Sequence, residues 1–202
     1  MAAEAGGRVC VFCGSNTGAS ASFVTAAREL GAALAARGLA VVYGGGKVGL
    51  MGQLADAALE AGGQVVGVMP AHLVDREIAH PGLTRLEVTD SMHERKALMA
   101  ELASGFIALP GGFGTFEEVI EILTWNQLGL MSKPVVFLDV DGFYTPLLDF
   151  FDRSVEARFV RPGHRALAQR AIIVAEAIDR ATSTPPVTPH KWIDLDRDRD
   201  LT

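Results

Sequence analysis

The residues best suited to chemistry follow a buried strand predicted at 105–109, in the run Pro110-Gly111-Gly112-Phe113-Gly114-Thr115-Phe116-Glu117-Glu118. Glycines let the backbone turn sharply there and expose amide groups at the start of a helix predicted over 115–130. Free amides at a helix N-terminus, together with the helix dipole, favour a phosphate. Glu118 would lie in the first turn, beside that phosphate. Thr115 and Glu118 also have the spacing of a capping box, in which both side chains only satisfy the helix end.

A basic pair, Arg95 and Lys96, lies near the start of a helix predicted over 92–103, which Asp90 or Ser91 can cap. A guanidinium group can bind a phosphate through two parallel hydrogen bonds. The pair is therefore a candidate for anion binding at the carboxyl side of the preceding strand. The alternative is a solvated basic pair that faces acidic residues of the same helix.

A second glycine-rich turn, GGGKVGLMG at residues 44–52, follows a strand predicted at 40–43. It contains the G-x-G-x-x-G spacing of dinucleotide sites, but it follows the second predicted strand and no acidic residue ends the third. Val48 stands where a P-loop needs Ser or Thr for magnesium. We therefore expect no NAD or ATP here, and a turn whose amides approach a phosphate. The small residues at 13–17 after the first strand fit either a ligand contact or a plain turn.

The cysteines and histidines of the chain indicate no further reactive or metal site. Cys10 and Cys13 have redox spacing, but their odd separation places them on opposite faces of a strand, so we expect two buried free thiols. The five histidines are scattered without metal-ligand spacing, and no G-x-S-x-G turn is present. We expect neither a metal nor a cofactor.

These residues need a framework of short apolar strands that alternate with helices. Strands are predicted at 8–12, 40–43, 64–69, 83–88, 105–109, 135–138 and 171–174, and helices at 20–37, 49–61, 92–103, 115–130, 144–157 and 175–181. Continuous apolar strands alternating with helices indicate a parallel sheet covered on both faces. The fold class is therefore α/β, a Rossmann-like doubly wound parallel sheet flanked by helices on both faces.

Composition sets the remaining limits. The 202 residues carry a net charge of −6, and 49% of them are hydrophobic. We expect a single domain at 1–182 and a proline-containing tail at 183–202. A net acidic chain is a poor nucleic-acid binder, and we expect no membrane span because no long uncharged apolar run occurs. The start of the chain does not read as a secretory signal, and with two cysteines this predicts a cytoplasmic location.

Several of these motifs together resemble one known family. GGGKVGLMG at 44–52, Glu94-Arg95-Lys96 and PGGFGTFEE at 110–118, with VCVFCGS at 9–15 and TWNQLG at 124–129, are similar to the LONELY GUY (LOG) family. Its members are cytokinin riboside 5′-monophosphate phosphoribohydrolases, many of them once labelled possible lysine decarboxylases. The resemblance spans residues 8–181. A decarboxylase would need a lysine for pyridoxal phosphate, and none of the chain's lysines lies in a recognisable cofactor motif.

The resemblance implies a reaction and its residues. The family cleaves the N-glycosidic bond of N6-substituted AMP and releases the free base and ribose 5-phosphate. Carried over by position, the catalytic pair is Arg95 and Glu118. The implied substrate contacts, besides that pair, are Gly45, Glu77, Lys96, Gly111, Gly112, Phe113, Gly114, Thr115 and Thr124. Two alternatives remain open: an N-glycosidase of AMP or purine nucleotides in general, and a non-catalytic nucleotide-binding module.

The chemistry of the residues supports hydrolysis of a glycosidic bond. Breaking a glycosidic bond builds positive charge on the sugar ring, which a carboxylate stabilises. A phosphate remote from the scissile bond is a natural anchor.

The predicted helix at 115–130 is apolar on more than one face, which indicates a subunit contact. LOG-like proteins are dimers or larger, so we expect a homodimer, with a hexamer as the second possibility.

Overall fold

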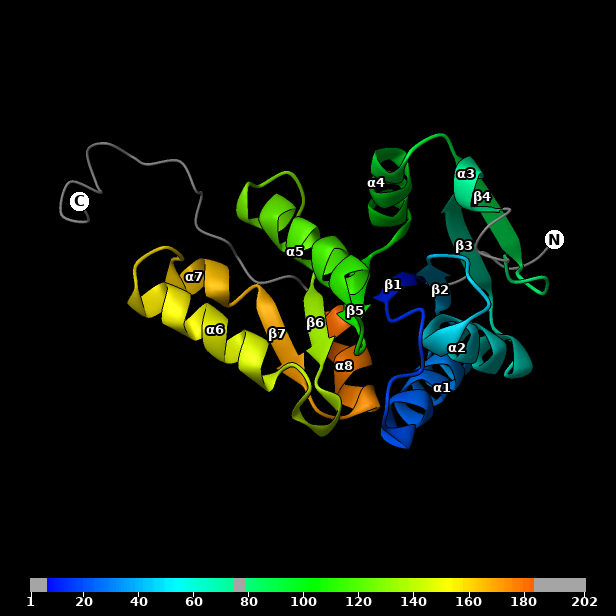
Figure 1. The fold of residues 1–202 in the computed structure, drawn as a ribbon, viewed down its shortest axis with the longest axis horizontal. Helices are drawn as coiled ribbons and strands as arrows, with labels where there is room; N and C mark the ends of the chain where they lie inside the picture. The colour runs from blue at the N-terminus through cyan, green and yellow to red at the C-terminus, as the bar shows by residue number, and fades with distance from the viewer. Residues whose placement is uncertain (1–6, 75–78, 184–202) are drawn as a thin grey trace.

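The computed structural model describes residues 7–74 and 79–183. Within them, seven parallel strands form one sheet in the order β4-β3-β2-β1-β5-β6-β7 (Figure 1). The strands are β1 (Arg8–Phe12), β2 (Ala40–Tyr43), β3 (Val65–Pro70), β4 (Arg85–Thr89), β5 (Gly105–Ala108), β6 (Val135–Leu138) and β7 (Ala168–Ala171). This confirms the predicted doubly wound α/β class.

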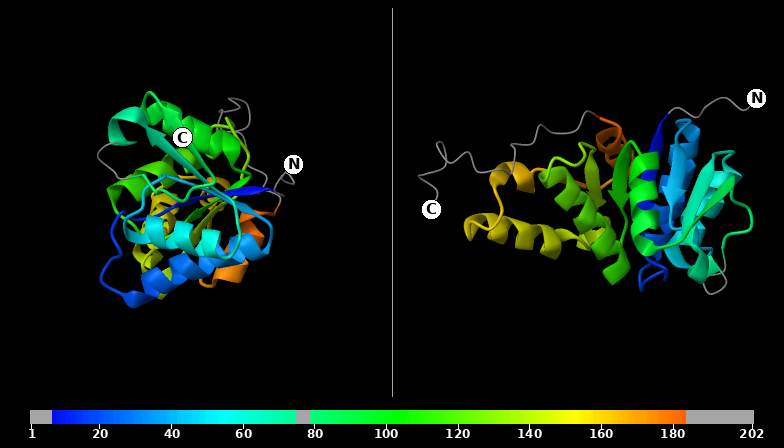
Figure 2. Two further views of the ribbon diagram at one scale, coloured as in Figure 1. Left: turned by 90° about the vertical axis from the view of Figure 1, so that its right-hand side faces the viewer. Right: turned by 90° about the horizontal axis from the view of Figure 1, so that it is seen from above.

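Helices cover both faces of the sheet, as the views in Figure 2 show. One apolar core packs the sheet against α1 (Ala21–Ala36), α2 (Gly49–Glu60) and α8 (Val174–Ala181). The other packs it against α4 (Met92–Leu102), α5 (Phe113–Gln127) and α6 (Thr145–Glu156). The strands are buried between the two cores, which explains their continuous apolar sequences. No helix within the described residues is long and apolar enough to cross a membrane.

The order in which the chain adds strands to the sheet reverses between β1 and β5. The chain starts at β1 and moves outward to β4, then returns to pair β5 with the other edge of β1, with Cys10 opposite Phe106. Because their connections leave toward opposite faces, the carboxyl ends of β1 and β5 border a crevice. Ligands bind at such a switch point in open α/β sheets. The turn at 14–18 and the loop at 110–115 both lie there.

The ends of most predicted strands and helices lie within two residues of the observed ends, but the last strand was misplaced. We predicted it at 171–174, whereas β7 is Ala168–Ala171 and pairs with β6 in register Val135 to Ala168. The apolar pair Ile172 and Ile173 lies beyond the strand and is exposed. An edge strand with one neighbour needs fewer apolar residues, and Arg170 instead binds Asp139 at the end of β6.

Three short helical segments were not predicted: α3 (Ala71–Val74), the 3₁₀ turn η1 (Val140–Gly142) and α7 (Pro162–Arg165). Each is too short to show helical periodicity. Ser91 caps α4 by accepting from the Glu94 amide, as expected. Cys10 and Cys13 are buried free thiols in the two opposite cores, which also confirms their prediction.

Candidate active site

Three loops meet at the carboxyl edge of the sheet and are tied to one another through their backbones. The Gly14 amide donates to the Pro110 carbonyl at 3.0 Å, and the Leu50 amide donates to the Gly14 carbonyl at 3.0 Å. Gly49 permits this approach, because a β-carbon there would lie 2.2 Å from the Ser15 carbonyl carbon. Its φ of +61° is a second requirement for glycine. The turns after β1, β2 and β5 therefore form one unit.

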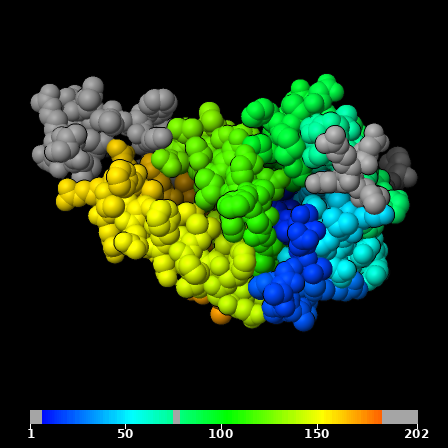
Figure 3. All heavy atoms as spheres, in the orientation of Figure 1, coloured from blue at the N-terminus to red at the C-terminus, as the bar shows by residue number. Residues whose placement is uncertain are grey.

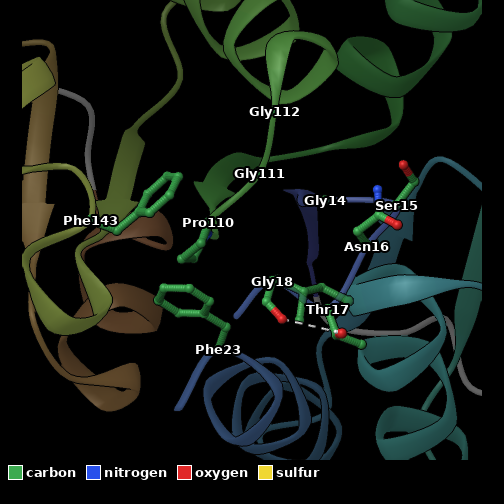
Figure 4. Close-up of a pocket in the computed structure, with 11 residues that line it drawn as sticks. Gly14, Ser15, Asn16, Thr17, Gly18, Phe23, Pro110, Gly111, Gly112 and Phe143 are labelled. Atoms are coloured by element: carbon green, nitrogen blue, oxygen red, sulfur yellow. Dashed lines mark hydrogen bonds between the residues drawn. The ribbon is translucent and has the colours of Figure 1, made fainter. Parts of the chain in front are cut away.

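A pocket of about 190 Å³ opens between the 14–18 turn and the start of the 110–115 loop. Figure 4 shows its glycine-rich side, with Gly14, Gly111 and Gly112, and its aromatic side, where Phe23, Phe143 and Pro110 lie together. The rings of Phe23 and Phe143 meet edge to face at 5.7 Å. Ser15, Asn16 and Thr17 line the opposite side. The pocket lies at the switch point that the topology identifies.

Helix α5 begins inside the glycine loop, two residues earlier than predicted. Gly112 is its N-cap and Phe113 its first residue, so Thr115 is in the third helical position. The predicted capping box, with Thr115 as the cap, is therefore wrong. Thr115 is buried, and its hydroxyl lies against Gly111, where a β-carbon would be 2.1 Å away. The amides of the first helical residues have no partner within the helix, which suits them to an anion.

Arg95 is buried, and two partners hold its guanidinium group. Its Nε donates to the Val68 carbonyl at 2.9 Å, and its Nη1 lies 3.1 Å from Glu118 Oε1. Gly44 leaves room for the guanidinium group, because a β-carbon there would lie 2.3 Å from Nη2. Only 10% of the Arg95 side chain and 12% of the Glu118 side chain are exposed. The alternative of a solvated basic pair is therefore wrong for Arg95.

Lys96 is also buried, and its ammonium group joins α4 to α5. It forms ion pairs with Glu117 and, at 2.9 Å, with Glu121. Burial alone would lower the pKa of Lys96, but the hydrogen bonds and charges of these two carboxylates outweigh it and raise the pKa. Lys96 is thus a charged clamp between two helices. Its role as a substrate contact stays a prediction.

The remaining implied contacts lie in three places. Gly45 is buried in the 44–49 loop, where its carbonyl accepts from the His80 amide at 3.0 Å. Phe113 is 91% exposed at the start of α5, and Thr124 lies on the exposed face of the same helix. Glu77 lies outside the described residues. The structure therefore brings together Arg95 and Glu118, and Glu118 lies on the helix that starts in the 110–115 loop.

Two aromatic residues of the pocket were missed from the sequence. Phe23 comes from α1 and Phe143 from the turn after β6, so neither belongs to a glycine motif. The position of Phe143 after a predicted strand was the available signal. The thiols offer no nucleophile, since burial, with the negative charge of Glu118, raises the pKa of Cys10 and Cys13. In the described part of the chain, no group of three or more acidic, His or Cys residues could hold a metal.

Comparison with known proteins places this chain in a family. The family model described as "Possible lysine decarboxylase" matches residues 51–181. A probable cytokinin riboside 5′-monophosphate phosphoribohydrolase of Oryza sativa subsp. japonica, LOGL2, is 45% identical over 190 residues, which cover 92% of this chain and 78% of the relative. The phosphoribohydrolase LOG1 of Arabidopsis thaliana is 44% identical over 179 residues, covering 89% and 84%.

Solved structures share the fold. The molybdenum cofactor carrier protein of Chlamydomonas reinhardtii aligns with a TM-score of 0.66 and 26% identity, covering 86% of this chain and 94% of that protein. The identity to the plant phosphoribohydrolases is far higher and extends over most of both chains. Together with the paired Arg95 and Glu118 beside the glycine loop, these matches show that the chain belongs to the LOG family, whose sequence model is described as "Possible lysine decarboxylase".

Proposed function

We propose that this protein is a hydrolase of N-glycosyl bonds that cleaves cytokinin riboside 5′-monophosphates into a free cytokinin base and ribose 5-phosphate. One observation carries the proposal. Glu118 lies within the first two turns of the helix that starts in the glycine loop, and its carboxylate is paired with the buried Arg95 of α4. The names of the curated relatives, 42–50% identical, support the same reaction.

The amides at 112–115 supply the anchor in this proposal. The 5′-phosphate of the nucleotide binds at the N-terminus of α5, where the helix dipole favours an anion. Ser15, on the facing turn, adds a hydroxyl donor at the pocket. The phosphate is remote from the scissile bond, so its binding energy fixes the ribose relative to Glu118.

Glu118 and Arg95 act at the glycosidic bond. Hydrolysis breaks the bond between C1′ and the base, adds the oxygen of water to C1′ and transfers a proton to the departing base. The Glu118 carboxylate stabilises the positive charge that develops on the sugar ring. Arg95 is anchored by the Val68 carbonyl and by Glu118, so it presents a fixed positive charge beside the reacting groups. The low exposure of both side chains strengthens these interactions.

The test is incubation with isopentenyladenosine 5′-monophosphate and, separately, with AMP, followed by chromatography of the products. We expect isopentenyladenine and ribose 5-phosphate from the first substrate, at a higher rate than adenine from AMP. Equal cleavage of AMP would instead identify a general nucleotide N-glycosidase. Binding of both nucleotides without cleavage would identify a non-catalytic module and overturn the proposal.

We also propose a homodimer formed through the outer face of α5. This face carries the exposed Phe113 and Ile120, and it forms a shallow hollow together with Thr124, Trp125 and the exposed Leu130 that follows the helix. Figure 3 shows α5 on the side of the molecule turned toward the viewer, between α6 and α4. A helix that needs only one apolar stripe for its own sheet has here a second one. Exposed apolar groups gathered in this way are typical of subunit contacts.

Light scattering at micromolar concentration tests the assembly. The expected mass is twice the 21.4 kDa of the chain, and Ile120→Glu should shift the protein toward the monomer. A mass six times that of the chain would indicate a hexamer. A fully active monomer would contradict the proposed interface.

We place the protein in the cytoplasm. The two thiols, Cys10 and Cys13, lie in separate cores without a disulfide, which suits a reducing compartment. Fractionation of the source cells would test this location.

A further inference from the structure

The segment between β6 and α6, residues 139–144, contacts Leu109, which directly precedes the glycine loop. Its Tyr144 is completely buried, and the Tyr144 hydroxyl donates a hydrogen bond of 2.7 Å to the Leu109 carbonyl. Leu109 is the residue directly before Pro110, where the loop begins. The neighbouring Phe143 lies at the pocket beside Pro110 (Figure 4). Tyr144 itself is not among the residues that line the pocket.

The Leu109 carbonyl is a sensitive point for the geometry of the loop. It belongs to the peptide bond that joins Leu109 to Pro110, and proline has no amide hydrogen with which the backbone could fix this unit. The Leu109 amide is bound to the Phe12 carbonyl at 2.9 Å, and the Pro110 carbonyl accepts from Gly14. The bond from Tyr144 holds the carbonyl between these two points. The Tyr144 hydroxyl thus helps to fix the direction in which the 110–115 loop leaves the sheet.

Tyr144 is held in turn by a buried carboxylate. Asp139, whose side chain has no exposed area, accepts from the Tyr144 amide at 2.6 Å and from the Thr145 hydroxyl at 2.8 Å. Arg170 on β7 donates to the same carboxylate at 2.8 Å and neutralises its charge. This network joins the ends of β5, β6 and β7, and it leaves the Tyr144 ring little freedom.

The ring is also fixed by its neighbours. Phe137 and Phe143 meet it edge to face, with centroid distances of 4.9 and 5.1 Å. Burial, with smaller effects of Cys13 and Asp139, raises the pKa of Tyr144, so the hydroxyl keeps its proton and acts as a donor. A rigid donor of this kind is suited to hold another group in place.

We infer that Tyr144 is a positioning residue for the reaction: its hydroxyl holds the Leu109 carbonyl so that the amides of the 110–115 loop point at the substrate phosphate. The inference rests on the proposed function, since it assigns the phosphate to this loop. Tyr144 acts through the loop and does not touch the substrate.

Tyr144→Phe tests this inference, because it removes one oxygen atom and keeps the packed ring. We expect the KM for isopentenyladenosine 5′-monophosphate and the Kd for ribose 5-phosphate to rise about tenfold, as for the loss of one well-formed hydrogen bond. The value of kcat should stay near that of the wild type, because Arg95 and Glu118 are not touched.

Thr84→Val is the matched control. Thr84 accepts a hydrogen bond from the Val65 amide at 3.0 Å, at the opposite edge of the sheet. This variant should lose stability without a change in KM or Kd. If Tyr144→Phe lowers the melting temperature but leaves KM and Kd unchanged, as the control does, Tyr144 is structural only and the inference is wrong.

Binding of ribose 5-phosphate separates this inference from the proposed function. If the wild type hydrolyses no nucleotide but binds ribose 5-phosphate, and Tyr144→Phe binds it about tenfold more weakly, the proposed reaction fails while the positioning role stands. If the wild type does not bind ribose 5-phosphate, the loop is not a phosphate site and both are overturned.

Discussion

The two glycine-rich loops, at 44–49 and 110–115, look alike in sequence but differ in the space around their glycines. In the 44–49 loop, the space of a missing side chain is taken by the protein itself. A β-carbon at Gly44 would lie 2.3 Å from the Arg95 guanidinium, and one at Gly49 would lie 2.2 Å from the backbone of Ser15. In the 110–115 loop, Gly111 is packed against Thr115 in the same way, but a β-carbon at Gly112 or Gly114 would meet no atom within 4 Å among the described residues.

This difference separates two uses of glycine. The 44–49 loop is part of the packing that places Arg95, whereas the 110–115 loop keeps its backbone accessible at a helix N-terminus. Both loops are bound by a buried tyrosine hydroxyl, from Tyr43 to the Gly46 carbonyl at 3.2 Å and from Tyr144 to the Leu109 carbonyl at 2.7 Å. Glycine content alone thus does not identify a ligand site, because the glycines of the 44–49 loop serve packing.

The largest effect is expected for Glu118→Gln, which removes the carboxylate charge from the helix that starts in the 110–115 loop. The turnover number should fall by about a hundred- to ten-thousand-fold, the usual range for a lost catalytic carboxylate, because the neutral amide offers no negative charge to the developing sugar cation. Steady-state hydrolysis and the circular dichroism spectrum would be measured together. Glu117→Gln, on the adjacent half-exposed carboxylate, is the control and should keep turnover near the wild-type rate. Wild-type turnover in Glu118→Gln would reduce Glu118 to an ion-pair partner.

The next effect contrasts the two loops directly. Gly112 has φ −103° and ψ −155°, which alanine can adopt, so Gly112→Ala should fold normally and raise KM about tenfold or more by crowding the phosphate. Gly49→Ala should instead destabilise the fold, because of its positive φ and its contact with Ser15. Melting temperature and KM of both variants would be compared. A stable, fully active Gly49→Ala enzyme would contradict the contrast.

A smaller effect is expected at the clamp between α4 and α5. Lys96→Met should lower the melting temperature by about 3 to 10 °C at neutral pH, because it leaves Glu117 and Glu121 without their partner. The folded state raises the pKa of Lys96 above its usual 10.5, so the stabilisation is present below pH 10.5 and is lost as the pH rises through the folded pKa. The difference between the two proteins should therefore shrink only in alkaline solution. A difference independent of pH would show that the charge of Lys96 does not matter.

The smallest effect is expected for Tyr43→Phe. Its bond to the Gly46 carbonyl is long, and Gly46 belongs to a loop already fixed by packing. The melting temperature should fall by about 2 to 4 °C, and KM should change little, in contrast to Tyr144→Phe. Parallel thermal and kinetic measurements on the two variants would show the contrast. Equal increases in KM would mean that both loops bind substrate.

The sequence predicted the sheet well because its central strands are buried on both faces and must be continuously apolar. The edge strand β7 was misplaced because Arg170, a polar residue, lies inside it while Ile172 and Ile173 lie beyond it. Apolar content marks a strand only where both faces are covered. The three shortest helical segments were missed for another reason, since each is too short to show helical periodicity.

The site was predictable in part. The 110–115 loop, Arg95 and Glu118 follow from motifs, and the structure brings them together. The clamp of Lys96 to Glu117 and Glu121 depends on how α4 packs beside α5 across β5, and no local pattern encodes that distance. The roles of Tyr144 and Asp139 likewise depend on contacts between β6, β7 and the loop after β5.

The central claim is that the 110–115 loop binds a 5′-phosphate and thereby places the sugar at Glu118. The most direct measurement compares kcat/KM for isopentenyladenosine 5′-monophosphate with kcat/KM for the same riboside without phosphate. Loss of two or more hydrogen bonds to a charged group predicts a preference for the monophosphate of at least about a hundredfold. Comparable values for the two substrates would contradict the account.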